Sequence, residues 1–336
     1  SLGQGLFIDE RRATLRKAKL YLESTEFERQ VLFNELIYDA GRSYWDWFMH
    51  FHTVLVFREA ERVAIERFDG VKQSALSGES AAIDTLEAGI QVQNRTLSLQ
   101  QAEINYQKSK AMLSAFLWAE GIIPLEIDDN IIPMALEEAS VEAMDLTSLE
   151  NVNELILNHP KLKFYEYKIA GLEIDQRLAR EFLKPEIDLS LKALSSPVNG
   201  NAFNDYNTKD YALGIDLNFP LFLRKARGNN ELAKLKRTGV EYELQNNQAQ
   251  LLAKAIGALN EWAITSNQIT IYTKTVNDYQ LLFEGEQRLF QAGESSLFMV
   301  NSRESGYINA RVKSIEIKAK GLKAKLAAEY TFGTLN

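Results

Sequence analysis

Proline is confined to one stretch of this 336-residue chain, and its placement limits the possible folds more than any other feature. The six prolines fall at positions 124, 133, 160, 185, 197 and 220. Because proline breaks the interior of a helix, the residues before 124 and after 220 are free of the strongest helix breaker. Both flanks are also rich in Ala, Leu, Glu, Lys, Gln and Arg, which favour helix.

Each flank contains one predicted reversal, near residues 70–80 in the first and 285–296 in the second. We therefore expect a long helix over roughly 10–76 and a shorter one over 81–118, then a long helix over roughly 225–291 and a shorter one over 296–333. At about 1.5 Å per residue, each long helix would extend on the order of 100 Å. Helices of this length are normally coiled-coil arms. The expected fold is mainly α, built from long antiparallel helical coiled-coil hairpins.

The middle of the chain has a different pattern. Residues 119–160 are predicted to be irregular, and a helix over 161–184 is bounded by Pro160 and Pro185. Apolar and polar residues then alternate around 187–193 and 211–219, which predicts a β-hairpin over 187–219. Such alternation is typical of a membrane-barrel strand and equally of a half-buried hairpin in a soluble protein. On a barrel, the second strand would turn these residues to lipid: Tyr211, Leu213, Ile215, Leu217 and Phe219.

Composition argues against several classes of protein. The formal net charge of −8 argues against a nucleic-acid partner. The absence of cysteine excludes disulfide frameworks, thiolate zinc sites and cysteine nucleophiles. No run approaches the ~18 consecutive apolar residues of a transmembrane helix, and no signal peptide is visible.

The chain matches itself without a gap when it is shifted by 215 positions. The matching pairs are Leu6 and Phe7 with Leu221 and Phe222, Arg12 with Arg227, Ala18–Leu20 with Ala233–Leu235, Glu28 with Glu243, Trp47 with Trp262, Phe68 with Phe283, Gly70 with Gly285, and Gly78–Ser80 with Gly293–Ser295. Unrelated helical hairpins would need compensating insertions, so we interpret the match as a duplication.

The duplication predicts how the chain is organised. Residues 1–118 form a first repeat, a helical hairpin; residues 119–160 form an irregular equatorial segment; residues 161–336 form a second repeat of helix, β-hairpin and helical hairpin. Ser1 falls on Asp216, inside the second predicted strand. We therefore expect an equivalent first β-hairpin, and a helix before it, upstream of Ser1.

Several segments resemble the TolC-type outer-membrane efflux proteins. NHPKLKFYEYKIAGLEIDQRLAREFLKPEIDLSLKA is similar to the family's helix that ends in a proline just before a barrel strand, and GIDLNFPLFLRKARGNNELAKLK to its passage from strand to helix. SGESAAIDTLEAGIQVQNRTLSLQQAEINY and AGESSLFMVNSRESGYINARVKSIEIKAK resemble the tip turns and returning helices. The family's Asp-Val-Leu-like triplet is Asp84-Thr85-Leu86 here, and has drifted to Met299-Val300-Asn301 in the second repeat.

The resemblance covers essentially the whole chain, and it implies a function. It implies a homotrimer in the outer membrane of Gram-negative bacteria whose copies share a β-barrel and extend a helical domain into the periplasm. A periplasmic adaptor and an inner-membrane pump would complete an efflux or type I secretion machine, with this chain as its passive export duct. The alternative is a soluble coiled-coil scaffold, in which the predicted strands would be buried within the protein.

The predicted turns are the candidate site of such a duct. Gly78, Glu79 and Ser80, and their equivalents Gly293, Glu294 and Ser295, are expected to form the tips on which the adaptor docks. A glycine lets the backbone turn and approach a partner closely, although plain helix capping explains the same glycines. Asp69 and Asp84 are candidates for the periplasmic mouth, where solvated charges at helix ends are the simpler interpretation.

No catalytic constellation is visible. His50 and His52 are two apart, so on a helix they point to different faces and cannot share a metal. The neighbouring aromatic cluster Tyr44, Trp45, Trp47, Phe48 and Phe51 is interpreted as packing. We find no phosphate loop, serine elbow or zinc helix. We therefore expect no enzyme activity, no cofactor and no metal.

Overall fold

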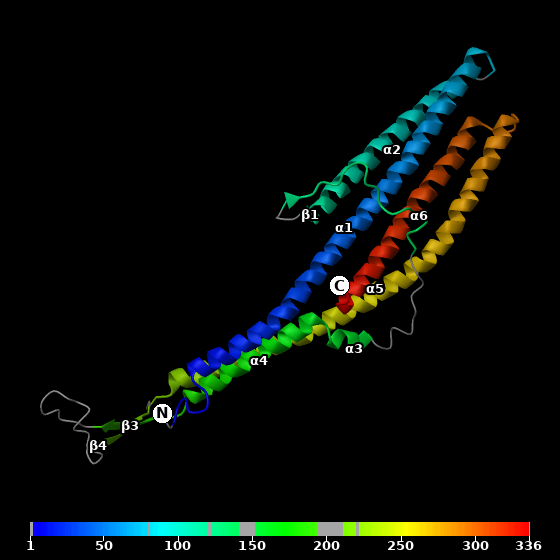
Figure 1. Cartoon of the computed structure of the whole chain (residues 1–336). Coiled ribbons are helices and arrows are strands. Elements are labelled where there is room, and N and C mark those ends of the chain that lie inside the picture. The colour runs from blue at the N-terminus through cyan, green and yellow to red at the C-terminus, as the bar shows by residue number, and fades with distance from the viewer. Residues whose placement is uncertain are drawn as a thin grey trace. The chain divides into compact units, whose positions relative to one another are not determined.

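The computed structural model describes residues 3–79, 81–119, 123–140, 152–193, 211–219 and 222–335. The fold is mainly α, as the sequence predicts, with a few short strands (Figure 1). In chain order the elements are α1 (Glu10–Leu76), α2 (Ala82–Ser114), β1 (Trp118–Ala119), β2 (Ile123–Pro124), α3 (Val152–Leu157), α4 (Pro160–Glu181), β3 (Glu186–Ala193), β4 (Tyr211–Asn218), α5 (Arg224–Gln291) and α6 (Leu297–Phe332).

The helix ends follow the residues that predicted them. α1 and α5 end at Leu76 and Gln291, and α2 and α6 begin at Ala82 and Leu297, so each pair lies 215 positions apart. α4 begins at Pro160, and the side chain of His159 accepts a hydrogen bond from the Lys161 N–H at 3.1 Å. Proline at the first helical position is favoured because its missing N–H would have no partner there.

The segment predicted to be irregular contains regular structure, which corrects that expectation. β1 and β2 pair antiparallel directly after α2, which ends at Ser114 rather than near 118. α3 follows at Val152–Leu157. Hydrophobic periodicity becomes visible only over several residues of a strand or several turns of a helix. Two-residue strands and a six-residue helix are too short to show it.

The chain divides into two compact units. The first unit comprises Ser1–Leu32 with Glu154–Leu251, and the second comprises Phe33–Asn153 with Leu252–Asn336. Each unit therefore draws on both sequence repeats. The division into two repeats thus describes the history of the sequence, and the compact units describe how the chain packs.

In the first unit, α4 packs against the beginning of α1. Ile8, Ala13 and Ile174 form a buried apolar cluster between them. The rings of Phe27 and Tyr167 stack with their centroids 5.5 Å apart. Ala13 therefore lies at a close contact between helices, a role for which its small side chain is suited.

In the second unit, the α1–α2 and α5–α6 hairpins lie side by side, with α6 against α1 (Figure 1). Val56 and Ala60 of α1 are buried against Ile308 and Ile315 of α6. Phe48, which also lies in α1, is fully buried. This seam of small and β-branched side chains holds the hairpins together and fixes where their tips lie relative to each other.

Candidate functional site

The two tip turns have the same backbone geometry. At the first tip, the Glu79 N–H donates to Ser74 O at 2.8 Å and the Gly78 N–H to Ala75 O at 3.2 Å. The second tip repeats both bonds at positions 215 residues later, with distances of 2.9 Å and 3.0 Å. This pair of bonds is the Schellman motif, which ends a helix on a left-handed residue.

Glycine occupies the left-handed position of each turn. Gly78 has φ of 81° and Gly293 has φ of 77°, a conformation that glycine adopts at no steric cost. A Cβ built on either glycine meets no atom within 4 Å. Both glycines therefore cap their helices, and the space beside each of them is open. The docking of a partner at these turns stays a prediction.

The other predicted tip residues have different surroundings. Glu79 and Glu294 are exposed, whereas Ser295 donates a hydrogen bond to Glu286 at 2.5 Å. Ser80 lies outside the described residues. The second tip is further fixed by Arg303, whose Nε lies 3.4 Å from Glu286 Oε2.

At the first tip, apolar residues stand where the second tip has Glu286 and Arg303. The equivalents of Glu286 and Arg303 are Val71 and Ala88, which are buried together with Leu297. The N-cap of α2 is Ala81, which makes no side-chain cap bond, whereas the N-cap of α6 is Ser296, which accepts from the Met299 N–H. The turns thus share a backbone but differ in the chemistry that supports them.

The two mouth candidates lie close to the first tip. Asp69 is exposed near the end of α1, and Asp84 is half-buried in the first turn of α2. A carboxylate in the first turn of a helix is stabilised by the partial positive charge of that helix end. This accounts for Asp84 without a role at a mouth.

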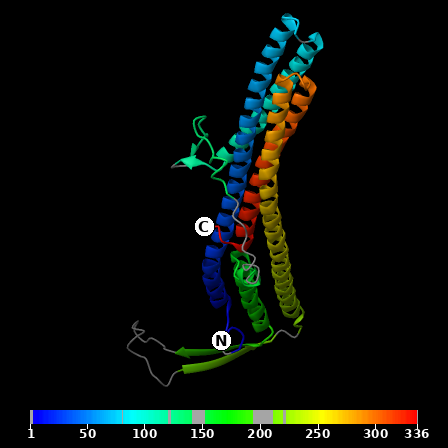
Figure 2. The same cartoon turned by 90° about the vertical axis from the view of Figure 1, so that its right-hand side faces the viewer.

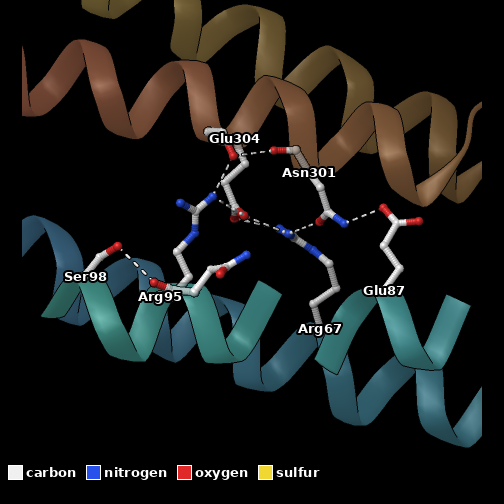
Figure 3. Close-up of polar contacts among 8 residues, drawn as sticks. Arg67, Glu87, Arg95, Ser98, Asn301 and Glu304 are labelled. Atoms are coloured by element: carbon white, nitrogen blue, oxygen red, sulfur yellow. Dashed lines mark hydrogen bonds and ion pairs between the residues drawn. The ribbon is translucent and has the colours of Figure 1, made fainter. Parts of the chain in front are cut away.

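A buried charge network joins the two hairpins a short way from the tips (Figure 3). Arg67 of α1 donates from both terminal nitrogens to the carboxylate of Glu304 on α6, each at 2.8 Å. Arg95 of α2 approaches the same carboxylate at 3.7 Å and donates to Ser305 Oγ at 2.8 Å. Asn301 accepts from Arg67 at 3.0 Å. Three helices therefore converge on one acid.

The network lies almost entirely out of solvent. The side chains of Arg67, Arg95 and Glu304 are 13%, 10% and 4% exposed. Burial lowers the pKa of Arg95, against the opposing effect of Glu304, and the neighbouring Arg67 lowers it further. Arg95 Nε is buried without a hydrogen-bond partner among the described residues. Among the described residues, Glu304 is the acid that forms ion pairs with both of these desolvated cations.

The charged residues of this network are not apparent in the sequence alone, although the duplication carries a signal for them. Under the 215-residue shift, Arg67 corresponds to Leu282, Arg95 to Ala310, and Glu304 to Gly89. The positions equivalent to these charged residues hold uncharged residues, so the two repeats have diverged here. Their partners are more than 200 residues apart, so neither local spacing nor periodicity connects them.

β3 and β4 form an antiparallel hairpin (Figure 2). Its register gives the hairpin one apolar face and one mostly polar face. Residues directly opposite each other in an antiparallel pair point to the same side. The pairs Ile187–Leu217, Leu189–Ile215 and Leu191–Leu213 therefore share one face. The other face carries these pairs: Glu186–Asn218, Asp188–Asp216, Ser190–Gly214 and Lys192–Ala212.

The apolar face is open to solvent. Leu213, Ile215, Leu217 and Phe219 are all at least 50% exposed, and Leu191 is 70% exposed. The described elements of the first unit therefore do not cover this face. Tyr211 pairs with Ala193 at the end of the hairpin.

The predicted aromatic cluster is packing, as expected. Trp47 and Phe48 are buried, and their neighbours meet them edge to face. His52 lies beside a cavity of about 620 Å³ between α1, α5, α6 and residues 132–137. Its Nε2 is 3.0 Å from Met134 O, and burial lowers the pKa of the imidazole.

Two searches of the described residues bear on membranes and metals. None of the helices within the described ranges has an apolar stretch sufficient to cross a bilayer. In the same part of the chain, no three His, Cys, Asp or Glu side chains gather as metal ligands would.

Comparison with known proteins places the chain in a family. The family described as "Outer membrane efflux protein" matches residues 151–327. The proteases secretion protein PrtF of Dickeya chrysanthemi is 26% identical over 223 residues, which cover 63% of this chain and 46% of PrtF. The chain thus spans about half the length of that relative.

Solved structures agree in fold. The CmeC outer membrane channel of Campylobacter jejuni superposes with a TM-score of 0.75 at 17% identity, covering 96% of this chain and 67% of that one. The outer membrane protein VceC of Vibrio cholerae superposes with a TM-score of 0.74 at 13% identity, covering 96% and 75%. With its family match extending over more than half its length, the chain belongs to the outer membrane efflux protein family.

Proposed function

We propose that this protein is the outer-membrane channel component of a tripartite efflux or type I secretion system. It would act as a homotrimeric, passive duct, with strands in the outer membrane and helices in the periplasm. The observation that carries the proposal is the β3–β4 hairpin, which has exposed apolar side chains, among them Leu191, Leu213 and Leu217, on one face and mostly polar residues on the other. A transmembrane barrel needs both faces, one for lipid and one for a wet lumen.

The alternative, a soluble coiled-coil scaffold, makes the opposite demand on this hairpin. A soluble protein would bury Leu213, Ile215 and Leu217 against its helices, since exposed apolar patches of this kind mark interaction surfaces. These side chains are exposed in the described structure. That observation favours a lipid neighbour over a scaffold.

The tips are the proposed docking site for a periplasmic adaptor, which would link the duct to an inner-membrane pump. Gly78 and Gly293 leave open space beside the backbone at both turns, and Glu79 and Glu294 are exposed next to them. A partner could therefore approach the turns closely without displacing a side chain. Asp69 and Asp84 would contribute negative charge to the mouth.

The proposed task involves no bond chemistry. The protein would provide a path, and the pump would supply the energy. The name of PrtF refers to the secretion of proteases, and CmeC is described as an outer membrane channel. For this chain, we propose exported proteins as the cargo class, on the similarity to PrtF.

Fractionation of the bacterial envelope tests the proposal. The protein expressed from its own gene is expected in the outer-membrane fraction and should require detergent for release. Purified protein added to a planar lipid bilayer should produce discrete conductance steps. Recovery in the soluble fraction without detergent would favour the scaffold and remove the channel.

A further inference from the structure

We propose that the cavity beside His52 is a binding site for a small organic anion, one that carries a single carboxylate on an apolar body. The inference goes beyond the proposed duct and does not depend on it. The cavity has a volume of about 620 Å³ and lies wholly within the second compact unit. Cavities of about 300–1,000 Å³ with a mainly apolar lining and a few polar groups are typical sites for small molecules.

Apolar side chains make up most of the cavity wall. They come from three helices and from the segment that follows β2, so the cavity is enclosed by parts of the chain that are far apart in the sequence. An apolar body that enters this space gains free energy as its surface leaves water. The apolar side chains that matter most here are Phe51 and Leu55 of α1, Ile269 and Val276 of α5, Ile315 of α6 and Leu136 of the segment after β2.

Two cations and one acid also line the cavity. Arg311 is already paired with Glu59 at 3.0 Å, and Glu137 is exposed to solvent. Lys318 donates a hydrogen bond to the carbonyl oxygen of Leu136, and within the described part of the chain no carboxylate forms an ion pair with it. Burial lowers the pKa of Lys318, against the opposing charge of Glu137. Lys318 is therefore a half-buried cation that lacks a paired counter-charge.

The first repeat carries an ion pair at the equivalent place. Under the 215-residue shift, Thr273 and Lys318 of the cavity correspond to Arg58 and Glu103. The side chains of Arg58 and Glu103 form an ion pair at 3.6 Å across α1 and α2. In the second repeat a short neutral side chain stands in place of the arginine, and a cation stands in place of the acid. The second repeat thus has room between α5 and α6, and a charge there that needs a partner.

A second contact between the helices differs between the repeats in the same way. Thr96 of α2 donates a hydrogen bond to Glu61 of α1 at 2.6 Å. The equivalents of these residues are Arg311 and Val276, which both line the cavity. An apolar side chain therefore stands where the first repeat has an acid. The carboxylate of a ligand would supply the negative charge that the first repeat provides from its own side chains.

The lining also sets the charge and the shape of the ligand. Because Arg311 is engaged by Glu59, Lys318 is the cation that can receive an anionic group, which matches a head with one negative charge. Ser314 lies about one turn before Lys318 on α6 and adds a hydroxyl to the same wall. Hydrogen bonds between charged groups are roughly twice as strong as those between neutral groups. The rest of the wall suits a hydrocarbon ring or short chain.

Equilibrium dialysis with 2-naphthoate tests the site, because this probe joins one carboxylate to an apolar ring. The purified protein is dialysed in its purification buffer, with any detergent at the same concentration on both sides of the membrane. We expect saturable binding of 2-naphthoate. 2-Naphthamide, which has the same ring without the charge, should bind about ten-fold more weakly, and 2-naphthylmethylammonium more weakly still. Equal binding of the three probes would overturn the choice of an anion, and the absence of saturable binding would overturn the site.

Variants of α6 test the role of Lys318. Lys318→Met should weaken the binding of 2-naphthoate about ten-fold. Lys320→Met is the matched control, because it removes an exposed charge of the same helix that pairs with Glu261 at 3.2 Å, and it should leave the binding unchanged. Lys318→Glu should reverse the preference, so that 2-naphthylmethylammonium binds more tightly than 2-naphthoate. Unchanged binding of 2-naphthoate in Lys318→Met would overturn the role of this lysine.

A double variant tests the comparison between the repeats. Thr273→Arg with Lys318→Glu places in the second repeat the residue types that form the ion pair of the first. We expect this variant to bind neither charged probe, because the new pair occupies the space and satisfies its own charge. Binding of 2-naphthoate at the affinity of the parent would overturn the comparison. Circular dichroism shows whether each variant is folded, and the three probes decide the question on the unmodified protein even where a variant does not fold.

Discussion

Glu304 is the acid that ties α6 to both arginines of the first hairpin. It is almost fully buried and is the shared partner of Arg67 and Arg95. Bringing three charges out of water is costly, and the attraction between them repays that cost only while all three are present. The network is therefore a weak source of stability but a strong constraint on which residues can occupy these positions.

Replacing Glu304 should reveal that constraint. In Glu304→Gln the two arginines remain buried without a counter-charge, and we expect a loss of about 3–5 kcal/mol in the free energy of unfolding. Urea unfolding followed by circular dichroism measures it. Glu66→Gln, which breaks the exposed pair with Arg62, should cost about 0.3–0.5 kcal/mol. Equal losses in both variants would contradict the role assigned to Glu304.

His52 makes stability depend on pH. Burial holds the pKa of its imidazole below the ordinary value of 6.5, so the folded state favours the neutral ring. The unfolded chain binds the proton more readily, and stability is therefore lost as the pH falls below about 6.5. Melting temperatures between about pH 7.5 and pH 5.5 should fall less in His52→Gln than in the parent. Parallel pH profiles would show that His52 is not involved.

Single residues could be predicted from the sequence where their role depends on local backbone geometry, and could not where it depends on a distant partner. Gly78 and Gly293 could be found because a left-handed turn at a helix end selects glycine locally. Arg67 and Glu304 could not, because a charged residue in a long helix is ordinary until its partner is known. That partner lies 237 positions away.

The elements themselves were largely predictable because they depend on local signals. The prolines and the tip glycines delimit α1, α4 and α5 to within a few residues. The alternation of apolar and polar residues gave β3 and β4, and their observed register places the apolar residues of both strands on one face. The alternation does not show whether that face contacts protein or lipid, because an apolar face is favourable in both environments.

Placing an arginine on each face of β4 in turn would distinguish a protein environment from a lipid environment. Leu217 lies on the apolar face and Asn218, its neighbour, on the polar face. Leu217→Arg should cost about 2–4 kcal/mol if the residue meets the hydrocarbon core, and should lower the amount of folded protein in the outer membrane. Asn218→Arg should be tolerated, since it would face the lumen. Folded protein is counted on gels by its resistance to unfolding in detergent without heating. Equal yields would argue against a lipid-facing Leu217.

For the whole molecule, the duplication produces two tips that are alike in backbone and unlike in support. One turn is braced by Glu286 and Arg303, and the other rests on Val71 and Ala88. A partner that binds mainly the backbone of the turns would bind both tips alike. A partner that binds side chains would distinguish between them. Docking to each tip must therefore be tested separately.

Bulk added at the tip glycines should block the adaptor. Gly293→Trp fills the open space beside the turn, and we expect weaker capture of the adaptor and reduced export while the trimer still forms. Gly293→Ala is the matched control. It carries the cost of placing a residue with a side chain in the left-handed conformation, about 1–2 kcal/mol, but it does not fill the space beside the turn. The same pair at Gly78 examines the other tip. Unchanged adaptor capture in both tryptophan variants would remove the case for these turns.

α2 exposes a stripe of apolar residues spaced seven apart, Ile83, Ile90, Leu97 and Ile104, and this stripe has a consequence for how the protein exists before it is assembled. A copy that has folded alone exposes an apolar stripe on α2 and an apolar side of the β3–β4 hairpin, so it is surface-active at both. If neighbouring copies cover the stripe, folding and association share one free energy, and the apparent stability rises with the concentration of copies. Dilution would then act on this protein as a denaturant does, and newly made copies would depend on meeting one another before they meet anything else.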